Sequence, residues 1–366
     1  MKSPHLDNDK ILRKTGTTLA LLALHTCLTN AALFVSTATT SAATAADLIE
    51  TSAADVTEAK LFKAKAESPP ATGTRPKIGL VLGGGGARGA AEVGVLKVLA
   101  KEGIKFDYVV GTSIGSVVGG FYCLGATPEQ MEKEFESGAV MRHFMTVPLW
   151  RRLVAAPIVF IPRILGSKQY DGLYAGNKFR KYLIGNMGAH DKNIEELKPT
   201  FAAVCLNVID GKPYIIRSGN LGYAMQASCA VPALRKPVEI DGKLFCDGGV
   251  ICNLPVKQCR QLGADIVIAV NIDEPFYPVP LSHLRKPGSM SERMVRWGLY
   301  DLDRSQAMLA DVVIQPDTDG ITLVSTSKKA AKQGVRAGEQ AAQEALPLIR
   351  KTLAAAGFTY GEDQKQ

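Results

Sequence analysis

Twice in this chain an apolar run passes through a glycine-rich turn into an amphipathic helix. Residues 78–82 (IGLVL) have the length of a buried parallel strand, and a glycine run connects them to residues 90–102, where apolar residues recur at helical spacing. Residues 108–110 (YVV) lead in the same way through GTSIG into a second helical pattern. Such strand–helix alternation predicts an α/β fold with a mostly parallel sheet and helices on both faces.

The alternation continues to near the end of the chain. A third helix is expected from Thr127, because TPEQ at residues 127–130 combines a capping box with proline in the first turn. Further elements are expected as strands at 201–209, 213–217, 243–246, 265–272 and 312–315 and as an alanine-rich helix at about 327–355. We therefore interpret residues 77–357 as one folded domain and residues 358–366 as a tail.

Residues 140–173 depart from this pattern. Bulky apolar side chains such as Trp150 and Phe160 are mixed there with arginines, and little periodicity is visible. One interpretation is an insertion packed on the core, because long apolar loops are usually buried. The other is a lid or a membrane-facing flap, since arginine and tryptophan beside apolar residues suit an interface.

Residues 1–46 have the composition of an export signal. A weakly basic start precedes the apolar residues 19–24, and a Thr/Ala-rich tract with small residues follows. The apolar run is too short for a good membrane span, so we expect a cleaved signal and a periplasmic, secreted or outer-membrane location, with a retained anchor as the alternative. Cys27 fits the lipoprotein pattern poorly, because Thr26 stands where a small residue is usual. Residues 47–76 are polar, end in a Pro/Gly stretch and predict a disordered linker.

The charge balance limits the class of partner. A net charge of +8 and a pI near 9.0 indicate an anionic partner. The basic residues are scattered, and no block of them resembles a nucleic-acid-binding arm, so we expect no nucleic-acid partner. The remaining interpretations are a peripheral contact with an anionic membrane or an ordinary solvated surface.

The six cysteines beyond the export segment form no metal motif. Neither a CxxC pair nor a zinc-ligand spacing occurs, and most of these cysteines lie in apolar patterns, where cysteine behaves as a small buried hydrophobe. In an oxidising compartment Cys246 could pair with Cys252 or Cys259, and the sequence leaves the pairing open. We expect neither a metal nor an organic cofactor.

Ser113 lies in the second glycine turn, between Gly111 and Gly115. A serine exposed on a sharp strand-to-helix turn needs glycine at both positions, since side chains there would clash. The expected strand before it and helix after it are the context in which GxSxG holds a nucleophile. Ser113 is therefore the candidate nucleophile of an acyl-transfer site, and a purely structural turn is the alternative.

The first glycine run supplies backbone N–H groups for the negative charge that acyl transfer develops. The amides of Gly85 and Gly86 lie at a predicted helix N-terminus, and the amide of Ile114 follows the nucleophile. Losing one such donor typically costs about 10²–10³ in rate. Arg88 either adds positive potential or stabilises the loop. We expect the oxyanion hole to comprise Gly84, Gly85, Gly86, Arg88 and Ile114, with Gly89 as a further motif glycine.

The same run also fits the dinucleotide fingerprint GxGxxG, from Gly84 to Gly89. That fingerprint expects an acidic residue about 20 positions further on, at the end of the second strand. Here the second strand leads into the Ser113 turn instead. This context favours acyl transfer over nucleotide binding.

A nucleophilic serine needs a proton acceptor, and the chain has only five histidines. Two fall in the export segment, and the other three lie in apparent loops. Among these, only His283 follows the candidate acid, as in the usual order of α/β-hydrolases. Asp247 is the better candidate, because it follows an expected strand and because Gly248 and Gly249 let the backbone turn and expose the carboxylate. An ordinary Asp-Gly turn is the alternative.

Together these motifs resemble the bacterial patatin-like phospholipases, over about residues 77–273. Two further stretches, 227–233 (ASCAVPA) and 253–256 (NLPV), add to the likeness. The resemblance implies a patatin-like three-layer sandwich and hydrolysis of lipid acyl esters by a Ser113–Asp247 dyad, without a cofactor. One small departure is Leu-Gly at 82–83, where some relatives carry an acidic residue.

In a Ser–Asp dyad the aspartate must be a stronger base than a free aspartate. A free aspartate has a pKa of about 3.9 and accepts a proton from an alcohol poorly. Burial and a hydrogen bond to the serine must make it more basic. We therefore predict a shielded Asp247 within hydrogen-bond reach of Ser113, and modest turnover. The alternative function is a catalytically idle lipid- or membrane-binding module on the same fold.

Overall fold

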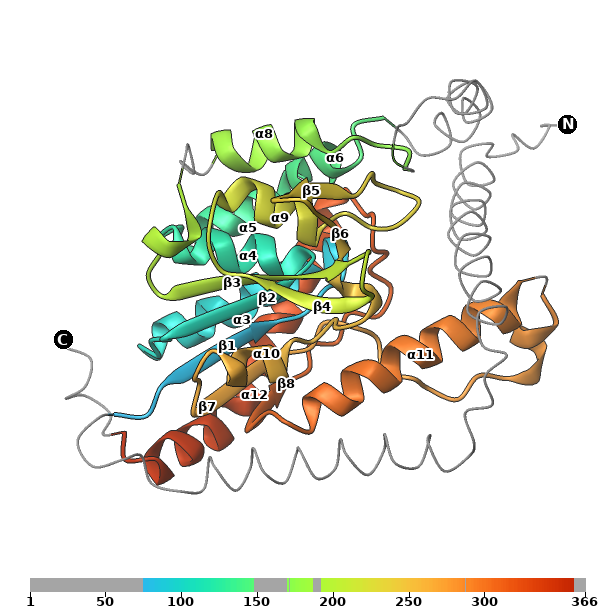
Figure 1. Cartoon of the computed structure of the whole chain (residues 1–366). Coiled ribbons are helices and arrows are strands. Elements are labelled where there is room, and N and C mark those ends of the chain that lie inside the picture. Colours follow the sequence, from blue (N-terminus) through green and yellow to red (C-terminus); the bar gives the residue numbers. More distant parts are fainter. Residues whose placement is uncertain (1–74, 148–169, 171, 187–191, 287, 359–366) are drawn as a thin grey trace, which may run out of the picture.

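The structure is a computed structural model that describes residues 75–147, 170, 172–186, 192–286 and 288–358. The expected export segment 1–46, nearly all of the expected linker 47–76 and the tail from residue 359 lie outside the described residues. Residues 148–169 and 171 of the expected lid also lie outside them. The described part is built on one sheet with helices on both sides (Figure 1).

The sheet has eight strands in the described part of the chain. They are β1 (Ile78–Leu82), β2 (Tyr108–Thr112), β3 (Thr200–Asn207), β4 (Lys212–Ile216), β5 (Val238–Ile240), β6 (Lys243–Asp247), β7 (Ile266–Val270) and β8 (Val312–Ile314). Their order is β5-β6-β3-β2-β1-β7-β8, and β4 also pairs with β3. The run from β3 to β8 is parallel, whereas β4 and β6 are antiparallel to β3, and β5 is antiparallel to β6. The predicted mostly parallel sheet is confirmed, with an antiparallel margin at one end.

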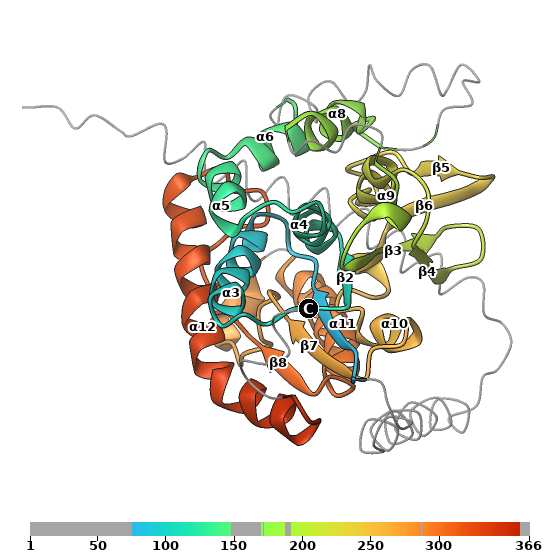
Figure 2. The ribbon, with the colours of Figure 1, turned by 90° about the vertical axis from the view of Figure 1, so that its left-hand side faces the viewer.

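Helices cover both faces of this sheet. The α-helices are α3 (Gly89–Lys101), α4 (Ile114–Cys123), α5 (Pro128–Glu136), α6 (Ala139–Phe144), α8 (Asn177–Asn186), α9 (Leu221–Ser228), α10 (Val256–Gln261), α11 (Ser289–Ala307) and α12 (Lys328–Ala355). The 3₁₀ helices are η1 (Gly86–Arg88), η2 (Ile194–Glu196), η3 (Gly248–Val250) and η4 (Leu281–Arg285). Helices α3 and α12 lie together on one side of the sheet, and α10 lies on the other (Figure 2).

The strands alternate between two apolar cores, one on each face. Along β1, Leu80 and Leu82 pack in the larger core with α3, α4 and α12, whereas Val81 packs in the smaller core with α10. This period of two is what a strand covered on both faces requires. Two cores separated by one sheet make the three layers of the predicted α/β sandwich.

One edge of β3 is shared by two strands that approach it from opposite ends. β2 pairs with the first part of β3 and ends with Thr112 opposite Val204. β6 runs the other way and ends with Asp247 opposite Cys205, the next residue along β3. β4 occupies the opposite edge of β3 from Ala203 to Asn207. The C-terminal ends of β2 and β6 therefore meet, which brings together residues that are far apart in the sequence.

Candidate active site

Ser113 lies on a strained turn between β2 and α4. Its φ of 52° with ψ of −121° is outside the region that non-glycine residues prefer. A Cβ at Gly111 would collide with the backbone of Gly115, and one at Gly115 would collide with the carbonyl oxygen of Leu82. Glycine at both positions therefore allows the chain to turn sharply and present the serine.

The Ser113 hydroxyl donates a hydrogen bond to Asp247 Oδ2 at 2.7 Å. Asp247 is the last residue of β6, and its other oxygen, Oδ1, accepts from the N–H of Gly249 at 2.8 Å. The expected proximity of the two side chains, 134 positions apart, is therefore present. It follows from the meeting of β2 and β6 on β3.

Asp247 is buried, with 4% of its surface exposed. Burial raises the pKa of its carboxyl to about 6, although the hydrogen bonds from Ser113 and Gly249 and the positive charge of Arg235 act in the opposite direction. Desolvation disfavours the charged form of a carboxyl and makes it a stronger base. The carboxylate is thus more basic than an exposed aspartate while staying mostly ionised at neutral pH.

The glycines after Asp247 allow the turn of η3 to pass close to the sheet. A Cβ at Gly248 would press on the carbonyl oxygen of Val204, and one at Gly249 would lie 3.0 Å from Asn253 Oδ1. Larger residues would therefore displace the backbone that holds the carboxylate.

In the glycine loop before α3, some backbone N–H groups already donate hydrogen bonds within the protein and others do not. The N–H of Gly84 donates to Asn253 O at 3.2 Å, and that of Arg88 donates to Gly85 O at 3.1 Å. Neither is a free donor, so these contacts do not support the expected place of Gly84 in the oxyanion hole. The amides of Gly85, Gly86 and Ile114 have no acceptor among the described residues. These three remain as candidates for an oxyanion hole.

The Arg88 side chain fastens the loop and does not face the site as a free charge. It is buried, its Nε donates to Ile321 O at 3.0 Å, and Nη1 pairs with Asp273 at 3.1 Å. Its other terminal nitrogen pairs with Glu274. Of the two roles expected for Arg88, stabilising the loop is the one that these contacts support.

Gly89 lets the glycine loop and the serine turn pack together. A Cβ there would collide with the side chain of Ile114, which follows the nucleophile. The two backbone segments that offer the free amides are thus in direct contact.

Two serines hold the turn that carries Ser113. Ser228 Oγ accepts from the Ser113 N–H at 2.9 Å and donates to Val204 O at 2.7 Å. Ser116 Oγ donates to Ser113 O at 2.6 Å. Ser228 belongs to the stretch 227–233 that carries the family likeness, but its role needed the structure to be seen.

Asn253 and Asp303 hold the glycine loop through a chain of hydrogen bonds. Asn253 Nδ2 donates to Gly84 O at 3.3 Å and to Asp303 Oδ2 at 3.0 Å. Burial raises the pKa of Asp303 to about 7. Asp303 comes from α11, fifty positions from its partner, so no local sequence pattern could have pointed to it.

Arg235 is a buried cation near the candidate dyad. It is 2% exposed, its guanidinium lies over the rings of Phe144 and Phe179, and its Nε and Nη1 have no hydrogen-bond acceptor among the described residues. Burial lowers its pKa to about 10, while nearby Cys229 and Asp247 act to raise it. No sequence pattern singled out this residue, because its importance comes from burial and tertiary contacts.

No described histidine bonds to Ser113 or Asp247. His143 is in α6, with its Nδ1 2.8 Å from Ala139 O and its ring stacked on Tyr182. His283 lies exposed in η4. Where the structure describes the site, the serine's partner is thus the carboxylate alone.

The cysteines considered for a disulfide are free thiols. Cys246, Cys252 and Cys259 are buried and unpaired, and burial raises the pKa of each thiol to about 12.

Within the described ranges, no group of three or more His, Cys, Asp or Glu residues could hold a metal ion. The same ranges contain no helix that is long and apolar enough to cross a bilayer.

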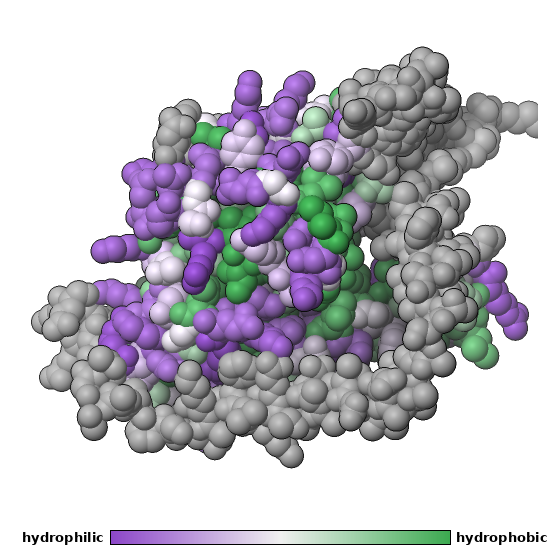
Figure 3. Space-filling model, in the orientation of Figure 1, coloured by the Kyte–Doolittle hydropathy of each residue, from purple (hydrophilic) through white to green (hydrophobic). Residues whose placement is uncertain are grey.

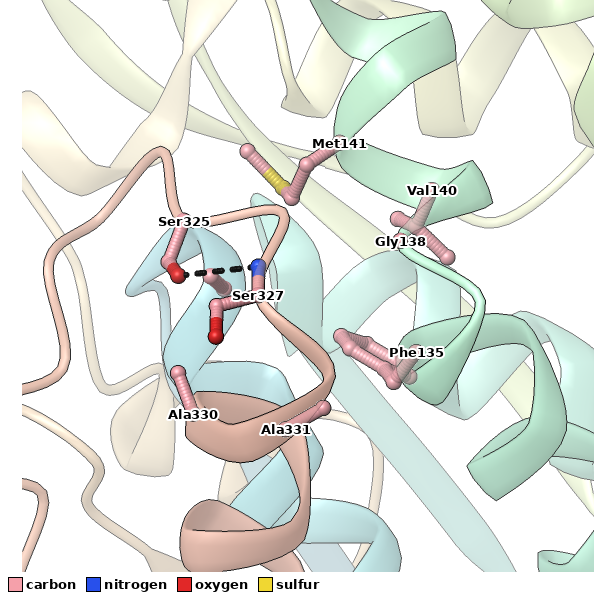
Figure 4. A pocket seen from close by; sticks show the side chains of 9 residues that line it. Phe135, Gly138, Val140, Met141, Ser325, Ser327, Ala330 and Ala331 are labelled. Carbon is pink, nitrogen blue, oxygen red and sulfur yellow. Dashed lines mark hydrogen bonds between the residues drawn. The ribbon is translucent and has the colours of Figure 1, made fainter. Parts of the chain in front are cut away.

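A small cavity lies away from these residues, between α5, α6 and the start of α12 (Figure 4). Its lining includes Phe135, Met141 and Ser327, and its volume is about 10 Å³. That is about the space for a single water molecule, so this cavity does not hold an acyl chain.

Known proteins similar to this chain point to one family. Residues 80–260 match the family described as patatin-like phospholipase. The chain is 34% identical to a patatin-like phospholipase domain-containing protein of Caenorhabditis elegans, over 53% of this chain and 13% of that protein. It is 30% identical to an uncharacterized NTE family protein of Mycobacterium bovis, over 64% of this chain and 60% of that protein. With lysophospholipase nte1 of Aspergillus fumigatus it shares 29% identity over 66% of this chain and 16% of that protein.

The fold and the site define an α/β sandwich protein with a GxSxG turn and an adjacent aspartate. Within that class, residues 80–260 form a domain of the patatin-like phospholipase family. The resemblance drawn from its motifs is thereby confirmed. The matched region spans at most 60% of the length of the relatives named above.

Proposed function

We propose that this protein is a serine lipid acyl hydrolase of the phospholipase A, lysophospholipase or esterase type. The observation that carries the proposal is the 2.7 Å hydrogen bond from the Ser113 hydroxyl to the buried carboxylate of Asp247. A carboxyl with a pKa of about 6 is matched to accepting a proton near neutral pH. The substrate class is inferred from the family and from the relative named as a lysophospholipase.

The reaction begins when Ser113 Oγ attacks the carbonyl carbon of the ester and its proton passes to Asp247. The carbonyl oxygen becomes negative and is stabilised by the amides of Gly85, Gly86 and Ile114. The tetrahedral intermediate collapses, the alcohol leaves with the proton from Asp247, and the acyl group stays on Ser113. Water gives a proton to Asp247 and attacks the acyl carbon. When this second tetrahedral intermediate collapses, Asp247 returns the proton to Ser113 Oγ and the acid is released.

One feature of the site limits the rate, and another assists catalysis. The proton acceptor is a single carboxylate, which is a weaker base than imidazole even with its raised pKa. The free amides are already positioned before substrate arrives, so stabilisation of the oxyanion needs no rearrangement of the loop. Catalysis is therefore expected to depend more on the amides than on the base.

The test is hydrolysis of short nitrophenyl esters, phosphatidylcholine and lysophosphatidylcholine by the full chain. Ser113→Ala and Asp247→Asn should each abolish turnover, whereas the exposed Ser218→Ala should not change it. Lipid binding without turnover at any acyl chain length would contradict the proposal and establish the idle binding module in its place.

We also propose that the protein is exported, because residues 1–46 have the order of charged, apolar and small residues found in signal peptides. Replacing Leu21 and Leu22 in the apolar run with arginine should retain the protein in the cytoplasmic fraction. Equal distribution of the two forms between fractions would overturn this part of the proposal.

A further inference from the structure

Helix α11 is poorly buried for its length. From Ser289 to Leu302 no described side chain is buried, and the first buried one is Asp303, near the C-terminal end. Figure 1 shows α11 reaching out beyond the sheet and the helices that cover it. A helix of 19 residues gains most of its stability from packing an apolar face, and along its first three turns this one has no such partner within the part of the chain that the structure describes.

Large apolar side chains gather on this helix and on the segment before it. Of the sixteen exposed large hydrophobic residues in the described ranges, seven lie between 277 and 308. Met290, Met294 and Trp297 are 53%, 55% and 50% exposed, and their spacing places them on one face of α11. Leu281, in η4, is 76% exposed. Single exposed hydrophobics are ordinary, but a cluster of them marks an interaction surface.

The same stretch is basic. Residues 281–300 contain four basic residues and one acidic residue, and Arg285 and Lys286 are exposed. Hydrophobic and hydrophilic residues lie side by side at the right-hand tip of Figure 3, where α11 begins in Figure 1. Tryptophan and methionine flanked by arginine and lysine are typical of a helix that lies in a lipid interface. A second copy of this chain would instead bring like charges together.

This surface stands at the same edge of the sheet as the candidate dyad. β7 is parallel to β1, so the segment from Val270 toward α11 leaves the sheet at its C-terminal edge, where the glycine loop and the serine turn also lie. Two contacts join α11 to the glycine loop. Glu274 pairs with both Arg88 and Arg296, and Asn253 joins Asp303 to Gly84.

We infer that the exposed face of α11, with η4, is a docking surface for an anionic lipid bilayer. We call it the α11 face and define it by Leu281, Met290, Met294 and Trp297 with the exposed Arg285 and Lys286. When the α11 face is docked, the glycine loop lies next to the bilayer, which supplies the acyl ester. The choice of lipid as occupant rests on the proposed function, but the binding does not require catalysis.

The test uses the full chain carrying Trp150→Phe, which leaves Trp297 as the only tryptophan. Its emission should be that of a solvent-exposed indole in buffer and shift to the blue with vesicles containing phosphatidylglycerol. Vesicles of phosphatidylcholine alone should give a much weaker shift, and high salt should reduce the shift, because screening weakens the attraction of basic residues to anionic lipid.

Met290→Ser with Met294→Ser in the same background should weaken vesicle binding by at least about tenfold. The matched control is Leu348→Ser, a residue of α12 that is 50% exposed and should leave binding unchanged. Ser113→Ala should bind vesicles as the parent does, so a failure of the proposed catalysis stays separate from a failure of docking. A blue emission in buffer that vesicles do not change, a dimer in light scattering that the two serines disrupt, or equal losses with Leu348→Ser would each overturn the inference.

Discussion

Two regions at one edge of the sheet are built in opposite ways. Around Ser113 the polar groups are largely buried and bond to one another, with Asp247 and Ser228 fixing the serine from two sides. Along α11 the apolar side chains face outward and the helix buries little before Asp303. The buried site around Ser113 is built to hold reacting groups in fixed positions, whereas the exposed face of α11 is suited to binding a surface. Substitutions in one region should therefore leave the other intact.

The largest expected effect comes from Ser113→Ala. Removing the nucleophile should lower ester turnover by at least about 10³-fold, because no other group can form the acyl-enzyme. Vesicle binding should stay within error of the parent, and thermal stability should fall only modestly, because Asp247 loses the Ser113 hydrogen bond and keeps the one from Gly249. Turnover assays and calorimetry on the same preparation check this, and a parallel loss of vesicle binding would break the separation of the two regions.

The next largest effect contrasts two glycines. Gly115→Ala would drive a methyl group into the Leu82 carbonyl and should cost about 3–5 kcal/mol of unfolding free energy, as overpacking and strain do at their upper range. Gly298→Ala in α11 meets nothing within 4 Å and should stabilise that helix by about 0.5–1 kcal/mol. Denaturant unfolding measures both. Equal effects would show that the two regions do not differ in packing.

The pH dependence sharpens the account of the buried region. Asp247 must be ionised to accept the serine proton, and its pKa is about 6. Turnover of a soluble ester should therefore fall about tenfold for each pH unit below 6 and level off above it. Vesicle binding should not follow this curve. A rate that is flat between pH 5 and 7 would contradict the role given to Asp247.

A smaller effect concerns Arg235, whose positive charge lowers the pKa of Asp247. Arg235→Met removes that charge and should move the acid limb of the rate profile to higher pH. Arg235→Lys keeps the charge and serves as the control. The methionine variant should stay folded, since an apolar side chain can replace a buried cation whose Nε and Nη1 have no acceptor among the described residues. An unmoved acid limb in the methionine variant would show that the charge does not reach the carboxylate.

Buried, local features were the most predictable from the sequence. The strand over 201–209 is found as β3 and the one over 265–272 as β7, each within two residues, because apolar runs bounded by turn residues define buried strands. The capping box at Thr127 is present at the start of α5. Strand β5 was not predicted, because Glu239 interrupts its three residues and no apolar run marks it; it pairs with β6 at the margin of the sheet.

In the candidate site, too, some residues could be predicted from local sequence motifs and others could not. Ser113 and Asp247 could be named because each lies in a short motif with its own steric reason for glycine. The amides of Gly85, Gly86 and Ile114 were proposed from the sequence and have no acceptor among the described residues, whereas the engagement of Gly84 could not be predicted, since it depends on Asn253, far along the chain. Arg235 and the α11 face carry no motif, because burial in one case and exposure in the other are properties of the folded chain.

Covalent labelling tests directly whether Ser113 is the nucleophile that Asp247 activates. The full chain would be treated with a fluorophosphonate ester, digested and examined by mass spectrometry. The account predicts a single adduct on the peptide containing Ser113, absent from Ser113→Ala and formed much more slowly in Asp247→Asn. An adduct on another residue, or labelling of Asp247→Asn at the parent rate, would contradict it.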